Sequence, residues 1–219
     1  WNHAALTSAL DRTWIALLLL ALTLGATAGA VGLLEPTETR YAEIAREMRT
    51  SGDWLTPRLD GLPHFHKPPL AYWATAAGFA LCGRNEWGAR LPVAVASALT
   101  LGFTALAARR RFGTLGISPP LAVWLLGSSL LFMAIGRALA SDPFLAAAVA
   151  GFWALAPSPW ALACLGTGFL AKGPVVFVPT ALAILAAAAL GRDRAPLALL
   201  GPARGWLLFA AIALPWYLI

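Results

Sequence analysis

Three side chains that can carry a proton or a positive charge stand close together in the stretch PHFHKPPLAYW, residues 63–73. His64 and His66 are two residues apart, so an extended segment places both imidazoles on one side. They are candidate zinc ligands, but zinc usually takes three or four ligands, so a metal site is unsupported and no cofactor is expected. His64 and His66 are also candidate substrate contacts. Lys67, which follows directly, suits binding of an anion such as phosphate.

Other ionisable residues border long apolar runs, and these are Glu35, Glu38, Arg40, Asp142 and Lys172. A carboxylate can take a proton from a hydroxyl or orient it, and a guanidinium or ammonium group can hold a phosphate. Asp142 has a structural alternative, because Ser-Asp-Pro at 141–143 is also a good start for a helix. Both roles stay open for Asp142.

The composition indicates which class of protein positions these residues. The chain has 219 residues, of which 59% are apolar and 12% charged, whereas a soluble domain is about 25% charged. Four uncharged runs approach the roughly 20 residues that a membrane-spanning helix needs: Trp14–Leu34, Leu91–Ala108, Phe112–Gly136 and Gly173–Leu190. The sequence therefore predicts an all-α, multi-span integral membrane protein. A net charge of +6 then favours contact with membrane lipids over nucleic acid.

Residues 35–84 are predicted to form a loop outside the membrane that contains two helices. Apolar residues at positions 41, 44, 45 and 48 follow the spacing of an amphipathic helix, ended by Ser51-Gly52. Pro68–Cys82 is uncharged over only 15 residues, which is short for a span, so we expect a second helix that lies in the membrane interface.

This non-spanning interpretation also satisfies the positive-inside rule. It places the triple arginine Arg109–Arg111 on the cytoplasmic side. The run Pro143–Ala171 has 29 uncharged residues with a Pro-Ser-Pro break at 157–159. Its length leaves open whether it forms a complete hairpin. With a hairpin, the candidate residues of the first loop gather on the outer side with Asp142 and Lys172, which suits a substrate with a charged head group and a lipid tail.

A family resemblance rests on the stretch LLEPTETRYAEIAREMRTSGDWLTPRLDGLPHFHKPPLAYW, followed in order by NEWGARLP, SDPF, AKGPV and LPWYL. These segments resemble the GT-C membrane glycosyltransferases that use polyprenyl-phosphate sugars, the group of aminoarabinose transferases and protein O-mannosyltransferases. The resemblance covers nearly all of the chain and implies a single transmembrane module, residues 1–219, that forms the N-terminal part of a longer architecture.

The resemblance also implies an activity and a set of site residues. It implies an inverting enzyme of the bacterial inner membrane, with its active site facing the periplasm or cell exterior. The enzyme would move a sugar from a polyprenyl-phosphate donor to a lipid, glycan or protein acceptor. Arg40 and Lys67 match phosphate-binding positions, and Tyr41 matches the pattern but could simply pack. Glu38 and Asp142 are the predicted catalytic acids.

This sequence departs from the family pattern at two places. Thr37 stands where relatives often carry an acid before the glutamate, which leaves Glu35 as a reserve acid. His64 and His66 stand where relatives commonly have Tyr and Glu. An alternative function also stays open because members of the family are considerably longer than this chain, namely a truncated component that binds or transports the lipid carrier without catalysis. A partner subunit that completes the site is also left open.

Overall fold

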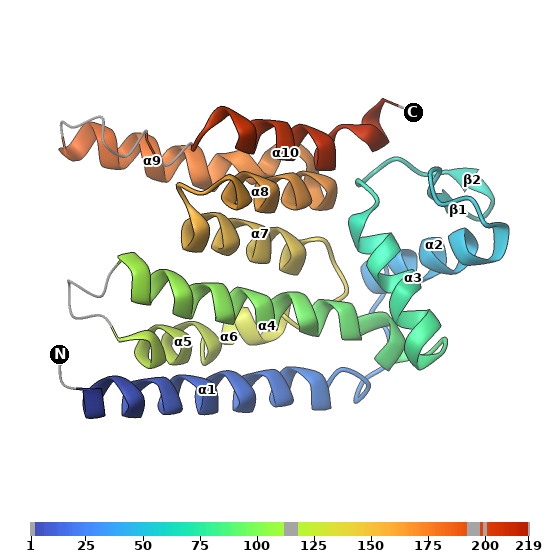
Figure 1. The fold of residues 1–219 in the computed structure, drawn as a ribbon. Helices are drawn as coiled ribbons and strands as arrows, with labels where there is room; N and C mark the ends of the chain where they lie inside the picture. Colours follow the sequence, from blue (N-terminus) through green and yellow to red (C-terminus); the bar gives the residue numbers. More distant parts are fainter. Residues whose placement is uncertain (1–2, 112–117, 192–197, 199–200, 219) are drawn as a thin grey trace.

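The protein is a helical bundle with a small polar module at one end. The computed structural model describes the chain except residues 1–2, 112–117, 192–197, 199–200 and 219. The elements, in chain order, are α1 (His3–Ala26), α2 (Thr37–Ser51), β1 (Arg58–Leu59), β2 (Leu62–Pro63), α3 (Leu70–Cys82), α4 (Glu86–Arg111), α5 (Pro119–Gly127), α6 (Leu130–Ile135), α7 (Asp142–Leu155), α8 (Pro159–Lys172), η2 (Gly173–Val176), α9 (Phe177–Gly191), α10 (Ala203–Ala213) and η4 (Pro215–Tyr217). In Figure 1 the long helices lie side by side, and α2, β1, β2 and α3 gather at one end of them, called the polar end below.

Both helices predicted for the first loop are present. Helix α2 buries the apolar face that the spacing predicted, and Gly52 ends it in a left-handed conformation with φ 74°. Helix α3 has 13 residues, about 20 Å in length. Between them β1 and β2 pair as a short antiparallel hairpin, with Arg58 opposite Pro63, which the all-α prediction did not include.

The predicted long runs differ in how they fold. Among the described residues, two helical stretches are long and apolar enough to cross a membrane, Glu86–Arg111 and Pro159–Leu190. The first is the single helix α4, as predicted from Leu91–Ala108. The second is interrupted at Gly173, whose φ of 67° cannot continue a helix. The described part of the predicted run Phe112–Gly136 is broken at Ser128–Ser129 into α5 and α6.

Helices α7 and α8 form a hairpin from the 29-residue run whose form the sequence left open. Each helix has 14 residues, about 21 Å in length, and they pack against each other. The side chain of Arg111, at the far end of α4, donates to the carbonyl groups of Trp153, in the last turn of α7, and of Ala156, which follows that turn. The triple arginine therefore lies at the end of the bundle opposite the polar end (Figure 1).

Helix α3 approaches α4 closely because both carry glycine at the contact. A Cβ atom added to Gly78 would lie 2.1 Å from the carbonyl oxygen of Gly88. We expect Gly78→Ala to separate the two helices and lower the free energy of unfolding by about 1–3 kcal/mol, the usual cost of overpacking. Thermal unfolding in detergent measures this. Gly102→Ala is the matched control, since nothing lies within 4 Å of that Cβ position; equal melting temperatures for the two variants would contradict the prediction.

Candidate functional site

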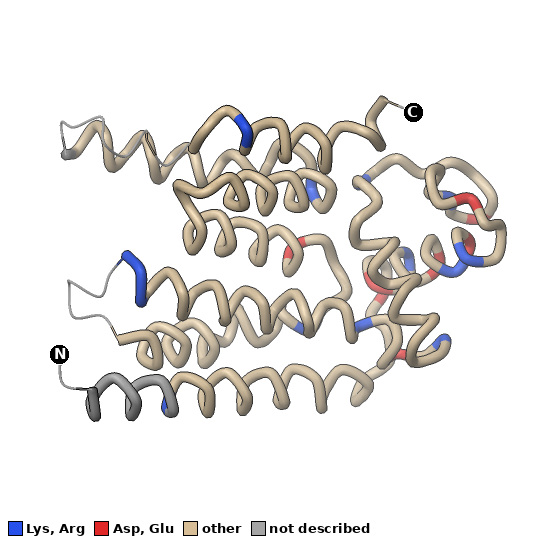
Figure 2. Tube along the Cα trace, viewed as in Figure 1, with Lys and Arg blue, Asp and Glu red and all other residues tan. Residues whose placement is uncertain are grey.

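Charged residues concentrate at the polar end of the bundle. Figure 2 shows acidic and basic positions over α2, the hairpin and the adjoining helix ends, whereas the middle of the bundle is almost free of them. Three separate groups of side chains lie there: a buried ion pair, an ion pair at the mouth of a cavity, and an arginine–histidine cavity in the first loop.

The buried ion pair joins Glu38 of α2 to Arg90 of α4. Arg90 Nε lies 2.9 Å from Glu38 Oε1, and Arg90 Nη2 lies 2.6 Å from Glu38 Oε2. The remaining N–H groups of Arg90 donate hydrogen bonds to the carbonyl oxygens of Ala28, Val31 and Gly32. All five N–H groups of the guanidinium are therefore used.

The carboxylate of Glu38 is equally saturated. It accepts the backbone N–H groups of Leu34 and Leu139, each at 2.7 Å, and the residue is 3% exposed. Burial alone raises the pKa of Glu38, but the hydrogen bonds from Arg90, Leu139 and Leu34 together with the charge of Arg90 outweigh it, so the pKa is lowered. Glu38 is thus an ionised carboxylate that ties α2 to α4 and to the segment before α7. This geometry gives no access for an acceptor hydroxyl.

Arg90 belongs to the sequence motif NEWGARLP, but the sequence alone indicates no function for it. A signal was available, because a charged residue one turn inside an apolar spanning helix needs a partner. The identity of the partner could not be read from the sequence, since Glu38 is 52 positions away.

The second ion pair joins Asp142, the first residue of α7, to Lys172, the last residue of α8. Lys172 Nζ lies 2.5 Å from Asp142 Oδ1, and the Asp142 side chain is 46% exposed. The hairpin of α7 and α8 brings the two residues together, as the predicted topology requires. Pro143 follows Asp142 in the first turn of α7, which fits the N-terminal preference of proline.

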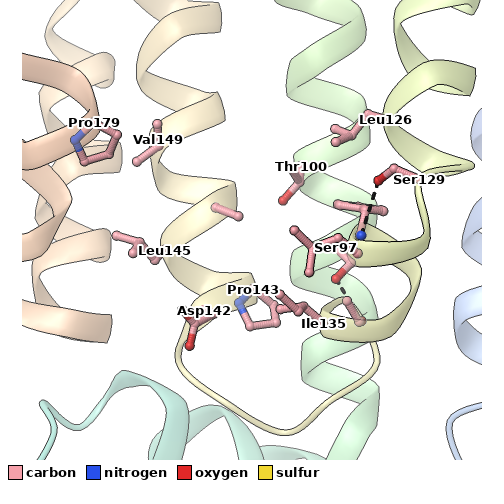
Figure 3. Close-up of a pocket in the computed structure, with 14 residues that line it drawn as sticks. Ser97, Thr100, Leu126, Ser129, Ile135, Asp142, Pro143, Leu145, Val149 and Pro179 are labelled. Carbon is pink, nitrogen blue, oxygen red and sulfur yellow. Dashed lines mark hydrogen bonds between the residues drawn. The ribbon is translucent and has the colours of Figure 1, made fainter. Parts of the chain in front are cut away.

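Asp142 also stands at one end of a mainly apolar cavity of about 410 Å³. Figure 3 shows the lining residues on separate helices: Ser97 and Thr100 on α4, Leu145 and Val149 on α7, Ile135 on α6 and Pro179 on α9. The Ser97 hydroxyl donates to the carbonyl of Gly136 at 2.9 Å. Most of the wall is hydrocarbon, so the cavity suits an apolar chain more than a free sugar.

The third group lies where α2 faces the first loop. Arg40, Thr39 and Glu43 of α2 line a more open cavity of about 390 Å³ together with Leu59 and His64. Glu43 is held by Arg46, with oxygen–nitrogen distances of 2.5 and 2.8 Å. The cavity is therefore lined by one guanidinium, a hydroxyl and an imidazole.

The other candidate residues of the first loop do not line this cavity. Tyr41 is buried, and its ring centroid lies 5.1 Å from that of Tyr72, so it packs as the alternative interpretation proposed. His66 is exposed, and its ring centroid lies 5.8 Å from that of His64. Lys67 is half-buried and Glu35 is exposed, and neither is in an ion pair within the described residues.

No third ligand joins the two histidines in the part of the chain that the structure describes. There, no group of three His, Cys, Asp or Glu side chains is placed to hold a metal ion. His64 and His66 are thus neighbours without the donor set that zinc requires.

The C-terminal turn closes the polar end from the other side. Trp216 Nε1 donates to the carbonyl of Leu55 at 2.8 Å, across 161 positions of sequence. The Tyr217 hydroxyl lies 3.3 Å from the carbonyl oxygen of Phe169, close to Lys172 on α8. The motif LPWYL therefore fastens the first loop to the helix that carries Lys172.

Comparison with known proteins gives a consistent set of relatives. The family model described as dolichyl-phosphate-mannose-protein mannosyltransferase matches residues 66–219. An undecaprenyl phosphate-alpha-4-amino-4-deoxy-L-arabinose arabinosyl transferase of Edwardsiella ictaluri (strain 93-146) is 33% identical over 202 residues, 85% of this chain and 36% of the relative. One of the same name from Pseudomonas savastanoi pv. phaseolicola (strain 1448A / Race 6) is 42% identical over 108 residues, 49% of this chain and 19% of the relative.

Solved structures of similar fold agree with these relatives. The apo crystal structure of ArnT from Cupriavidus metallidurans has a TM-score of 0.79 at 29% identity and covers 98% of this chain. The crystal structure of the same protein bound to undecaprenyl phosphate has a TM-score of 0.78 at 29% identity and covers 93% of this chain. The match spans 42% and 40% of those chains, so this chain corresponds to less than half the length of its solved relatives.

Proposed function

The chain belongs to the dolichyl-phosphate-mannose-protein mannosyltransferase family, and on that premise we propose that it transfers a sugar from a polyprenyl-phosphate carrier to a lipid, glycan or protein acceptor. This family membership confirms the resemblance on which the sequence prediction rested. The observation that carries the proposal is the grouping of charged residues of both signs at one end of an apolar helical bundle (Figure 2), where Asp142 lines a cavity that fits a hydrocarbon chain.

The donor chemistry follows from these cations. In an inverting transfer the acceptor oxygen attacks the anomeric carbon while the bond from that carbon to the phosphate oxygen breaks. The electron pair leaves with the carrier phosphate, so negative charge grows there. Arg40 and Lys67 are the proposed phosphate-binding residues, with Lys172 a further cation at the polar end. A lipid phosphate as leaving group needs no nucleotide-binding domain.

Asp142 is the proposed acid of the acceptor side. It stands at the mouth of the apolar cavity, and its side chain is partly open to solvent. A carboxylate in this position can orient an acceptor hydroxyl or take its proton, once Lys172 is displaced or shared. Glu38, first predicted to be catalytic, is instead proposed as a positioning residue because its oxygens are saturated. Glu35 is exposed and remains the reserve acid.

The proposed orientation in the membrane follows from the different charged residues at the two ends of the bundle. The long helices cross the bilayer of the bacterial inner membrane several times, with the polar end outside and the triple arginine inside, as the positive-inside rule prefers. Helices α2 and α3 then lie in the outer interface, where the Trp73 indole, which donates to the carbonyl of Trp54, stands at head-group level. The whole chain forms one module of a longer transferase, with residues 35–84 as its first outer loop.

Sugar transfer by full-length protein in membrane vesicles tests the proposal. Radiolabelled polyprenyl-phosphate sugars and nucleotide sugars are supplied separately with a membrane extract as acceptor. We expect label to move only from the lipid-linked donor, and Asp142→Asn to lower the rate by about a hundredfold or more, as for loss of a general base. Carrier binding without transfer from either donor would favour the non-catalytic alternative.

A further inference from the structure

The arginine–histidine cavity combines apolar walls, from Pro36 and Leu59, with a few side chains that can donate hydrogen bonds. Arg40 contributes a permanent cation and Thr39 a hydroxyl group, while the carboxylate in the wall, Glu43, is occupied by Arg46. An anion with several oxygens matches such a wall, because each oxygen can accept from a different donor.

His64 is the unusual member of this wall. Its backbone N–H donates to the carbonyl of Pro57 at 2.7 Å, which fixes the residue at the end of the hairpin. Its Nε2 atom is buried and has no hydrogen-bond partner among the described residues. Buried ring nitrogens are normally satisfied, so a ligand oxygen that reached this atom would supply its missing partner.

We propose that His64 is a third phosphate ligand beside Arg40, and that it takes up a proton when the phosphate of the lipid carrier binds. This inference rests on the proposed function and adds to it a residue and a pH dependence. A tyrosine hydroxyl in this place could donate a hydrogen bond but could not become a cation near neutral pH. The histidine would give this chain a carrier affinity that responds to pH.

The surrounding charges set the direction of the effect. When no phosphate is bound, burial, the neighbouring His66 and the charge of Arg40 together hold the pKa of His64 below its ordinary value. The other charged or titratable groups nearby are Glu43, which is paired with Arg46, Lys67, which is three positions further along the chain, and Tyr72 of α3, whose pKa is raised by burial and by Tyr41. None of these supplies a free negative charge to His64.

A bound phosphate reverses this balance. Its negative charge favours the imidazolium form, so binding raises the pKa of His64 and a proton is taken up. By linkage, affinity must then increase as the pH falls through the range between the two pKa values. Without the imidazole, only the titration of the ligand itself remains.

Binding of polyprenyl phosphate to full-length protein in nanodiscs tests the inference. Kd is measured between about pH 8 and about pH 6, the range in which a perturbed histidine titrates, for the wild type and His64→Gln. Between the higher and the lower pH, we expect the affinity of the wild type to increase about tenfold more than the affinity of His64→Gln.

Three outcomes would count against the inference in different ways. Parallel pH dependences in the wild type and His64→Gln would overturn it while leaving the proposed function intact. Absence of carrier binding at every pH would overturn both. Inorganic phosphate serves as a second probe: equal affinity for inorganic phosphate and polyprenyl phosphate would assign the cavity to a soluble anion and contradict the lipid head group as its ligand.

Discussion

Full-length protein with Lys67→Ala is expected to lose about two to three orders of magnitude in kcat/KM for the lipid-linked donor, the usual effect of removing one group that stabilises developing charge. Lys67 is half-buried and is in no ion pair within the described residues. Its ammonium group is therefore available to a phosphate. Steady-state transfer kinetics measure the loss, and carrier binding measured in parallel shows how much of it arises before the chemical step.

Arg84→Ala is the matched control for Lys67→Ala. Arg84 is an exposed cation in the turn between α3 and α4, also at the polar end. If general attraction of an anionic lipid by positive charge were the cause, the two variants would lose similar amounts. Equal effects would therefore contradict a specific role for Lys67.

The second large effect is expected at the Glu38–Arg90 pair. Arg90→Leu leaves Glu38 ionised and buried without its partner, which costs about 3–5 kcal/mol in folding free energy. The same change frees the carbonyl groups of Ala28, Val31 and Gly32 that Arg90 now satisfies. In detergent, the melting temperature and the resistance to protease are both expected to fall sharply.

The double variant Glu38→Leu/Arg90→Leu distinguishes the cost of leaving one charge without its partner from the cost of losing both side chains. Replacing both partners of a buried pair by apolar residues is often close to neutral, so we expect the double variant to recover part of the stability lost in Arg90→Leu. A double variant less stable than Arg90→Leu by the full cost of a second independent substitution would show that the two side chains are not coupled.

The sequence predicted a catalytic role for Glu38, whereas the structure places it in a buried ion pair. Glu38 lies beside Arg40 and Tyr41 in a motif that resembles the family, and a carboxylate at the start of an outer loop is a natural candidate for acid–base chemistry. Sequence spacing does not reveal which way the side chain of a helical residue is turned. The structure turns Glu38 toward α4 and turns Arg40 toward the loop cavity.

Other parts of the fold were predictable for definite physical reasons. The periodic apolar face of α2 and the short run of α3 are local signals, and each produced the element expected. The proline break at 157–159 is also a local signal, but the length of the run left the hairpin of α7 and α8 undecided. The break within Phe112–Gly136 was missed although Gly127-Ser128-Ser129 is a turn signal, because the uncharged run was treated as one span. The hairpin β1–β2 was missed because strands of two residues are too short to show alternation.

The candidate site was predictable only in part because it depends on contacts between distant segments. The meeting of Asp142 with Lys172 follows from helix lengths and the positive-inside rule. The shared cavity of Arg40 and His64, by contrast, depends on how the first loop folds back on α2. That packing is decided by buried side chains such as Tyr41 and Tyr72, whose partners no sequence pattern identifies.

The position of the carrier phosphate tests the central claim most directly. A cryo-electron microscopy structure of the full-length protein with polyprenyl phosphate would locate it. We expect the phosphate at the polar end, with its oxygens within hydrogen-bonding distance of the Arg40 guanidinium and the Lys67 ammonium group. A phosphate bound instead at the opposite end, beside Arg109–Arg111, would contradict the account.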